Sequence, residues 1–224
     1  MRTKILLTAA AAMVAGLVSS NAQVYSANVV GYANVVLVGN TGTGTGFSLI
    51  ANPFDDGNGN QLTNVIPAGA LANKSSLLTW NPSLGKYNAA ISKGASGWAS
   101  SVSLPPGVGF FVVNNSATPV TNVFVGSVVA NIGSSTTNTL GAGLSLVSSA
   151  IPYAEDIQTS TNINLFNLAN KSSIQTWNTG TQKYNAAVSK GAGGWASSIP
   201  VSVGQGFFIS TPNAGSNWVE TLNP

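Results

Sequence analysis

Residues 71–111 read LANKSSLLTWNPSLGKYNAAISKGASGWASSVSLPPGVGFF, and residues 168–208 repeat them as LANKSSIQTWNTGTQKYNAAVSKGAGGWASSIPVSVGQGFF. The offset is 97 residues throughout, no gap is needed, and 27 of the 41 positions are identical. Self-similarity of this length at one fixed offset indicates a tandem duplication. The chain is therefore expected to contain two copies of one module.

The local pattern of the copies predicts β-strands. Short apolar or β-branched runs alternate with clusters of Gly, Pro, Asn and Ser, which is typical of strands joined by turns. Residues 81–85 (NPSLG) predict a hairpin turn, because proline presets φ and glycine permits a positive φ. One helical turn is expected within residues 62–71. The runs that we interpret as strands of the first copy are residues 29–38, 47–51, 76–80, 86–91, 109–113 and 120–128.

Short strands at regular spacing favour an all-β fold of antiparallel sandwiches or jelly rolls. We expect two tandem antiparallel β-sandwich (jelly-roll-like) modules, residues 23–123 and residues 124–224, after a cleaved signal peptide. The apolar run at 120–128 resembles the run that opens the first module. This similarity predicts that one strand ends the first module and begins the second.

The first 22 residues, Met1 to Ala22, are typical of a secretory signal peptide. A positive start at Arg2 and Lys4 precedes an apolar stretch, and small residues before Gln23 suit a cleavage site. The apolar stretch is shorter than the about 20 residues that a membrane-spanning helix needs. The sequence therefore predicts export to the outside of the cell or the cell surface, with the periplasm as the alternative. No membrane insertion is expected after cleavage.

Composition excludes several classes of function. The chain has no Cys and no His, and charged residues make up 6%. Disulfide scaffolds, zinc triads and Ser–His–Asp triads are therefore absent. The full chain has eight Lys and Arg against five Asp and Glu. Without Arg2 and Lys4 the difference is 6 − 5 = +1, which gives no electrostatic footprint for nucleic acid.

No motif in the chain predicts catalysis. Ser83 and Lys86 fit an SxxK pattern, but that chemistry needs both side chains on one helix face, and a turn is expected here. We therefore expect a protein that is not an enzyme, has no catalytic residues and needs no cofactor.

The repeated aromatic residues are the main candidates for ligand binding. Exposed Trp and Tyr can stack on sugar rings, although large aromatics are more often buried in a core. Trp98 and Trp195 follow glycines, which favours exposure. Phe110 and Phe111 are expected to face opposite ways on one strand. The candidate ligand-binding residues are Trp80, Tyr87, Lys93, Trp98, Trp177, Tyr184, Lys190 and Trp195.

The loop after residue 54 is a weak candidate for calcium binding. Asp56, Asn58 and Asn60 alternate in an oxygen-rich loop, as calcium ligands do. The closing Glu of an EF-hand is missing, since Pro67 stands at the twelfth position. A surface loop without metal is the favoured interpretation, and no metal site is predicted.

The order of short motifs resembles a known kind of β-module. Residues 49–53 (LIANP), 80–81 (WN) and 106–111 (PGVGFF) follow one another, after an opening VYSANVVGYANVV at 24–36. This order is similar to modules of exported proteins from environmental Gram-negative bacteria, verrucomicrobial-type ones especially, and to their surface β-modules. The second copy departs from it with SSA at 148–150. The resemblance implies secretion and a β-sandwich, and it implies no established activity.

Two kinds of function follow as alternatives. One is a secreted structural or interaction protein of the cell surface or extracellular matrix. It would assemble with itself, as a homo-oligomer or filament, by donating the apolar strand 29–38, which carries no charge to guard its edge. If that strand is simply the first strand of its own module, no donation occurs. The other kind of function is a carbohydrate-binding protein that uses the paired aromatics to hold an extracellular polysaccharide.

Overall fold

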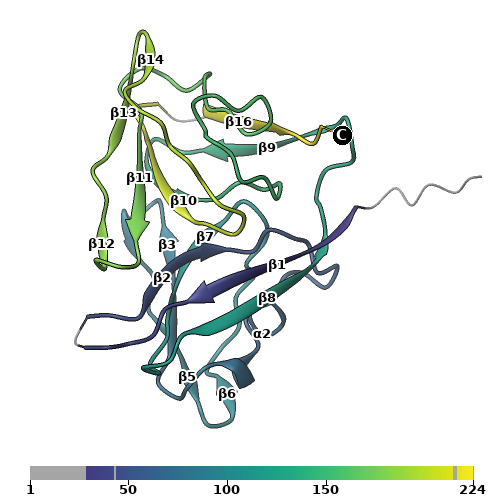
Figure 1. Cartoon of the computed structure of the whole chain (residues 1–224), viewed down its shortest axis with the longest axis vertical. Coiled ribbons are helices and arrows are strands. Elements are labelled where there is room, and N and C mark those ends of the chain that lie inside the picture. The colour runs from purple at the N-terminus through teal and green to yellow at the C-terminus, as the bar shows by residue number, and fades with distance from the viewer. Residues whose placement is uncertain (1–28, 43, 214–215, 224) are drawn as a thin grey trace, which may run out of the picture.

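The computed structural model describes residues 29–42, 44–213 and 216–223. The predicted signal peptide and its cleavage site lie outside these residues. Within them, no helix has the length and apolar character to span a membrane. The described chain folds into two tandem antiparallel β-sandwich modules, one in the lower half and one in the upper half of Figure 1.

The first module pairs a six-stranded sheet with a two-stranded ribbon. The sheet has the order β2-β7-β3-β5-β6, with β4 paired to β3, and the ribbon consists of β1 and β8. Two short helices, α2 (Leu62–Val65) and η1 (Ala68–Ala70), lie in the connection from β2 to β3, where one helical turn was predicted. The strands are β1 (Val30–Leu37), β2 (Phe47–Ala51), β3 (Ser76–Asn81), β4 (Lys86–Tyr87), β5 (Ile91–Gly94), β6 (Gly97–Trp98), β7 (Gly109–Val113) and β8 (Val120–Ser127).

The second module repeats this topology. Its six-stranded sheet has the order β10-β15-β11-β13-β14, with β12 paired to β11, and its ribbon consists of β9 and β16. Its strands are β9 (Ser135–Leu140), β10 (Gly143–Val147), β11 (Ser173–Asn178), β12 (Lys183–Tyr184), β13 (Val188–Gly191), β14 (Gly194–Trp195), β15 (Phe207–Thr211) and β16 (Ser216–Thr221).

The ribbons correct one expectation. All eight residues of β8 pair with β1, from Val30 opposite Ser127 to Leu37 opposite Val120. The second module opens with its own strand β9, which pairs with β16. Among the described strands none is shared between the modules, because each closing strand returns to the opening strand of its own copy. Strand β8 also crosses the expected boundary between residues 123 and 124.

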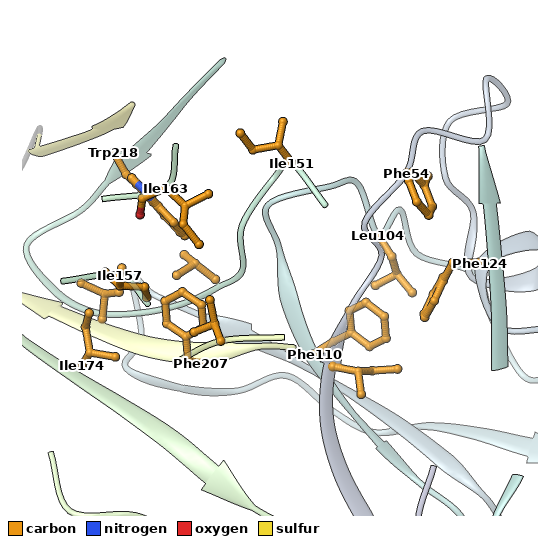
Figure 2. Packing of buried hydrophobic residues seen from close by; sticks show 14 of the residues in the cluster. Phe54, Leu104, Phe110, Phe124, Ile151, Ile157, Ile163, Ile174, Phe207 and Trp218 are labelled. Carbon is orange, nitrogen blue, oxygen red and sulfur yellow. The ribbon is translucent and has the colours of Figure 1, made fainter. Parts of the chain in front are cut away.

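Strands β2, β7 and β15 of the six-stranded sheets are buried on both faces, which explains their continuous apolar runs. Phe110 lies in the module core, whereas its neighbour Phe111 lies in a second cluster on the opposite face. Phe207 and Phe208 divide in the same way. The expected alternation is thus confirmed. Figure 2 shows the labelled core residues in two groups, with Phe110 in one and Phe207 in the other.

The second cluster joins the modules. It contains Leu49 and Phe111 of the first module and Leu146 and Phe208 of the second. Beside this cluster, two backbone hydrogen bonds run between the modules in opposite directions, and they join equivalent pairs of residues of the two copies. The Ala51 N–H donates to the Gly204 oxygen (2.9 Å), and the Ser148 N–H donates to the Gly107 oxygen (3.1 Å). The two copies therefore pack about a local two-fold axis.

Candidate functional site

The outer face of the β1–β8 ribbon is apolar and exposed. In antiparallel strands, alternate residues share one face, and the register puts Tyr32 opposite Val125 and Asn34 opposite Val123. The other side of the ribbon, which includes Phe124, packs into the core. Five side chains, each 52–75% exposed, form what we call the apolar face: Val30, Tyr32, Val36, Val123 and Val125.

The second module does not reproduce this face. The exposed residues of β9 are Ser135, Thr137 and Thr139, and those of β16 are Asn217 and Val219. Only Val219 among them is a large apolar residue. Because the same fold carries a polar surface in the other copy, the fold itself does not require the apolar face. Contiguous exposed apolar patches of this kind mark interaction sites.

Four of the predicted ligand-binding aromatics lie at the junction of the modules. The hydroxyls of Tyr87 and Tyr184 are hydrogen-bonded to each other at 2.7 Å. The Trp80 Nε1–H donates to the Leu144 oxygen of the other module (2.8 Å). The Trp177 Nε1–H donates in turn to the Phe47 oxygen (3.1 Å). These side chains hold the two copies together.

The other predicted ligand-binding residues lie away from the junction. Trp195 is buried and Trp98 is half-buried against the core, with its Nε1–H donating to the Ile66 oxygen (2.8 Å). The expectation that both tryptophans are exposed is wrong. The tight β5–β6 hairpin, with Gly97 at a φ of 120°, folds the indole back over the core. Lys93 is buried as well, and its Nζ donates to the Asn73 Oδ1 (3.0 Å).

Lys190 is half-buried on β13, the strand equivalent to the one that carries Lys93. It pairs in register with Trp195, as Lys93 pairs with Trp98. The structure therefore brings Trp80, Tyr87, Trp177 and Tyr184 together and leaves the two Lys–Trp pairs at separate hairpins.

An aromatic cup opens beside the tyrosine pair. It is a hollow of about 250 Å³ lined by Phe47, Leu78, Tyr87, Phe111, Trp177 and Tyr184. Burial, and then the hydrogen bond between the phenols, raises the pKa of Tyr87. Burial raises the pKa of Tyr184 as well. Both phenols therefore stay neutral, and the cup is uncharged.

The loop at residues 55–60 uses its oxygens internally. The Asp56 Oδ1 accepts the N–H groups of Asn58 and Asn60, both at 2.8 Å. The buried Asn60 accepts from Asn52 Nδ2 (2.9 Å). Although burial opposes it, this hydrogen bonding lowers the pKa of Asp56. Across the described residues, no group of three or more His, Cys, Asp or Glu is placed to hold a metal ion.

Comparison with known proteins adds no relative. No protein-family model matches the chain, and neither a curated protein nor a solved structure matches it.

Proposed function

We propose that the protein is a non-catalytic interaction protein, exported to the cell surface or extracellular matrix, and that it binds a second copy of itself through the apolar face. The observation that carries this proposal is the presence of five exposed apolar side chains on one ribbon and a polar surface on its duplicate. Duplicated modules start with equal surfaces. The difference between them therefore points to a role of the first ribbon that the second does not share.

The size and charge of the apolar face suit a second copy. From the exposed fractions, it offers roughly 500 Å² of apolar surface, near the upper end of what monomers expose. Two such faces with their polar rims approach the about 1,200 Å² at which specific interfaces begin. Asn34, Thr121 and Ser127 complete the face, and none of its residues is charged. Two copies can therefore meet without repulsion between like charges.

The arrangement favours a closed dimer over a filament. Strand β1 is paired with β8 of its own chain along its whole length, so its face, and not a donated strand, is left for a partner. An interface formed by the same patch on both copies closes after two subunits. In the described part of the second module, the β9–β16 ribbon is polar and offers no apolar face from which a further copy would continue.

Light scattering over a concentration series tests the dimer. We expect the mass to rise from one chain to two with concentration. The triple change of Tyr32, Val123 and Val125 to Thr should keep the protein monomeric. Threonine is favoured in strands, so the change makes the outer face of the first ribbon polar, like that of the second, without disturbing the pairing. Val219→Thr on the equivalent ribbon is the matched control and should still dimerise. A wild-type mass of one chain at every concentration would refute the proposed self-association.

Export is tested separately by expressing the chain with and without residues 1–22 in a Gram-negative host. We expect only the full chain to lose its leader and to leave the cytoplasm. Retention of the uncleaved full chain in the cytoplasm would contradict the proposed location.

The aromatic cup supports carbohydrate binding as a second candidate function. Trp177, Tyr87 and Tyr184 line it, and aromatic side chains next to a hydroxyl pair suit the apolar face of a sugar ring. At the equivalent place in the other copy, Leu78 is replaced by Gln175. We expect glycan titration to shift tryptophan emission and Leu78→Gln to remove the shift. No shift across a broad glycan panel would exclude this candidate.

A further inference from the structure

A groove of about 460 Å³ runs between the modules beside strand β10. Strand β10 is the first strand of its six-stranded sheet and so has one free edge. Trp80 and Pro82 from the first module and Leu146 from β10 are among the residues that line the groove. None of the described residues that line it is charged. An exposed strand edge in such a place is a template for pairing with another chain.

Leu144 stands beside this groove, since its chain neighbour Ser145 and its hydrogen-bond partner Trp80 both line it. Its carbonyl oxygen accepts the Trp80 Nε1–H (2.8 Å) and therefore points away from strand β15. In a β-strand the N–H and the C=O of one residue point to the same side. The Leu144 N–H thus points out of the sheet too, and no acceptor faces it among the residues that the structure describes.

The mirror position shows what this edge can bind. Phe47 on β2 is the equivalent of Leu144, and its N–H donates to the Gln182 Oε1 (2.9 Å). The Phe47 oxygen accepts both the Gln182 Nε2–H (3.2 Å) and the Trp177 Nε1–H (3.1 Å). The Gln182 carboxamide thus accepts from the Phe47 N–H and donates to the Phe47 C=O. A peptide group of a neighbouring strand would make the same two hydrogen bonds. The Phe47 edge is therefore closed by a peptide mimic from within the chain.

At the Leu144 edge that mimic is missing. The residue equivalent to Gln182 is Gly85, which has no side chain. Both residues have the same left-handed backbone, with φ of 59° for Gly85 and 53° for Gln182. The two turns thus have the same conformation at this position, and only the carboxamide differs.

We propose that an extended, uncharged segment of a partner polypeptide binds in this groove and adds to the edge of β10. One peptide C=O accepts the Leu144 N–H, and the following backbone pairs toward Leu146. The Leu144 oxygen can accept a second donor beside Trp80, as the Phe47 oxygen does. The segment is short, because Val108 already pairs with Val147 at the far end of the strand. The uncharged lining selects an uncharged partner segment.

The partner segment comes from another protein. Among the residues that the structure describes, the extended apolar strand that this chain could offer, β1, is paired with β8 along its full length. The apolar face lies on a different sheet, so peptide binding and dimerisation are independent. The test uses the Tyr32→Thr/Val123→Thr/Val125→Thr protein, which remains informative whether or not the wild type dimerises.

The probe is the capped peptide acetyl-Val-Thr-Val-Thr-Val-amide, titrated against the ¹⁵N-labelled protein. We expect a saturable shift of the Leu144 amide signal and slower hydrogen exchange there. Gly85→Gln should place the closing carboxamide on Leu144 and weaken binding at least about tenfold, the equivalent of one hydrogen bond with a favourable contact. Gly85→Ala is the matched control, since it has the same backbone strain without a carboxamide, and should still bind.

The reverse change gives a second measurement. Gln182→Gly opens the Phe47 edge, and the number of peptides bound per chain should rise from one to two. The proposal is overturned if the peptide causes no shift at Leu144 up to millimolar concentration. Equal binding by the Gly85→Gln and Gly85→Ala proteins would overturn it as well.

Discussion

At the scale of single residues, Glu220 is the least expected. Its side chain is fully buried in the second module, and its Oε2 accepts the N–H groups of Ala150 (2.7 Å) and Ile151 (3.2 Å). Its Oε1 is buried without a hydrogen-bond partner in the described structure. Burial outweighs the hydrogen bonds and raises the pKa of Glu220 to about 8. The sequence offers no sign of this, because a lone acid in a strand usually faces water.

This carboxyl should make stability depend on pH. Between the ordinary pKa of 4.5 and about 8, the folded state holds the proton more strongly than the unfolded state. The free energy of unfolding therefore falls as pH rises through that window, by an amount on the order of 4 kcal/mol. Glu220→Gln should remove most of this fall and be more stable than wild type at pH 9. Urea unfolding at pH 5 and pH 9 measures it.

Val219→Thr, a change at the exposed neighbour of Glu220, is the control and should keep the wild-type pH dependence. Equal stability of wild type at pH 5 and pH 9 would show that the carboxyl is not held neutral.

Gly109 tests how closely the modules approach. A Cβ at this position would lie 2.9 Å from the Val147 oxygen and 3.1 Å from Leu146 of the other module. Gly109→Ala should therefore force the modules apart and lower the free energy of unfolding by about 1–3 kcal/mol. Gly193→Ala, where no atom lies within 4 Å, should change it much less. Urea unfolding compares the two, and similar losses would contradict the close packing.

At the scale of elements, the sequence predicts most strands well. Residues 47–51 and 109–113 are strands with the predicted bounds, and Trp80 pairs with Tyr87 across the predicted turn. The predicted strand 86–91 is divided into β4 and β5, because four steps from Tyr87 to Ile91 lie opposite only three steps from Trp80 to Leu77, and this extra residue shifts the register. Repetition and turn residues are local signals, and they suffice for such elements.

The faces of the strands were harder to predict. In β1, Tyr32 and Val36 point outward, whereas Val35 and Leu37 point inward. Both sides of this strand are apolar, so alternation does not reveal which side is buried. Trp98 is half-buried and bonds to Ile66, 32 positions away, whereas Trp195 is buried. The bond between Phe47 and Gln182 joins residues 135 positions apart. Contacts of this range leave no pattern in a single sequence.

Each of the β3–β4 and β11–β12 hairpins contacts the edge strand of the other module through a tryptophan hydrogen bond. Trp80→Phe removes the indole donor to Leu144 and should lower the free energy of unfolding by about 1 kcal/mol. Trp177→Phe should have a smaller effect, since Gln182 still donates to the Phe47 oxygen. Parallel urea titrations measure the difference. A larger loss for Trp177→Phe would contradict this unequal closure of the two edges.

At the scale of the whole molecule, duplication has produced two kinds of surface. Those that the copies share, the inner faces around Phe111 and Phe208, pack against each other and are hidden. Those on which the copies differ are the two ribbons, of which the first carries the apolar face, and the two sheet edges, of which Gln182 closes the one at Phe47. Function in this protein is therefore expected where the repeat is broken.

Crosslinking tests the central proposal, the dimer through the apolar face, most directly. The chain has no Cys, so one introduced Cys reports on one place. Asn34 lies at the centre of the β1–β8 ribbon, and Thr137 lies on the equivalent ribbon of the second module. With a short bismaleimide, the Asn34→Cys protein should give a covalent dimer, and the Thr137→Cys protein should stay monomeric. Failure of Asn34→Cys to crosslink, or equal crosslinking of both proteins, would contradict the account.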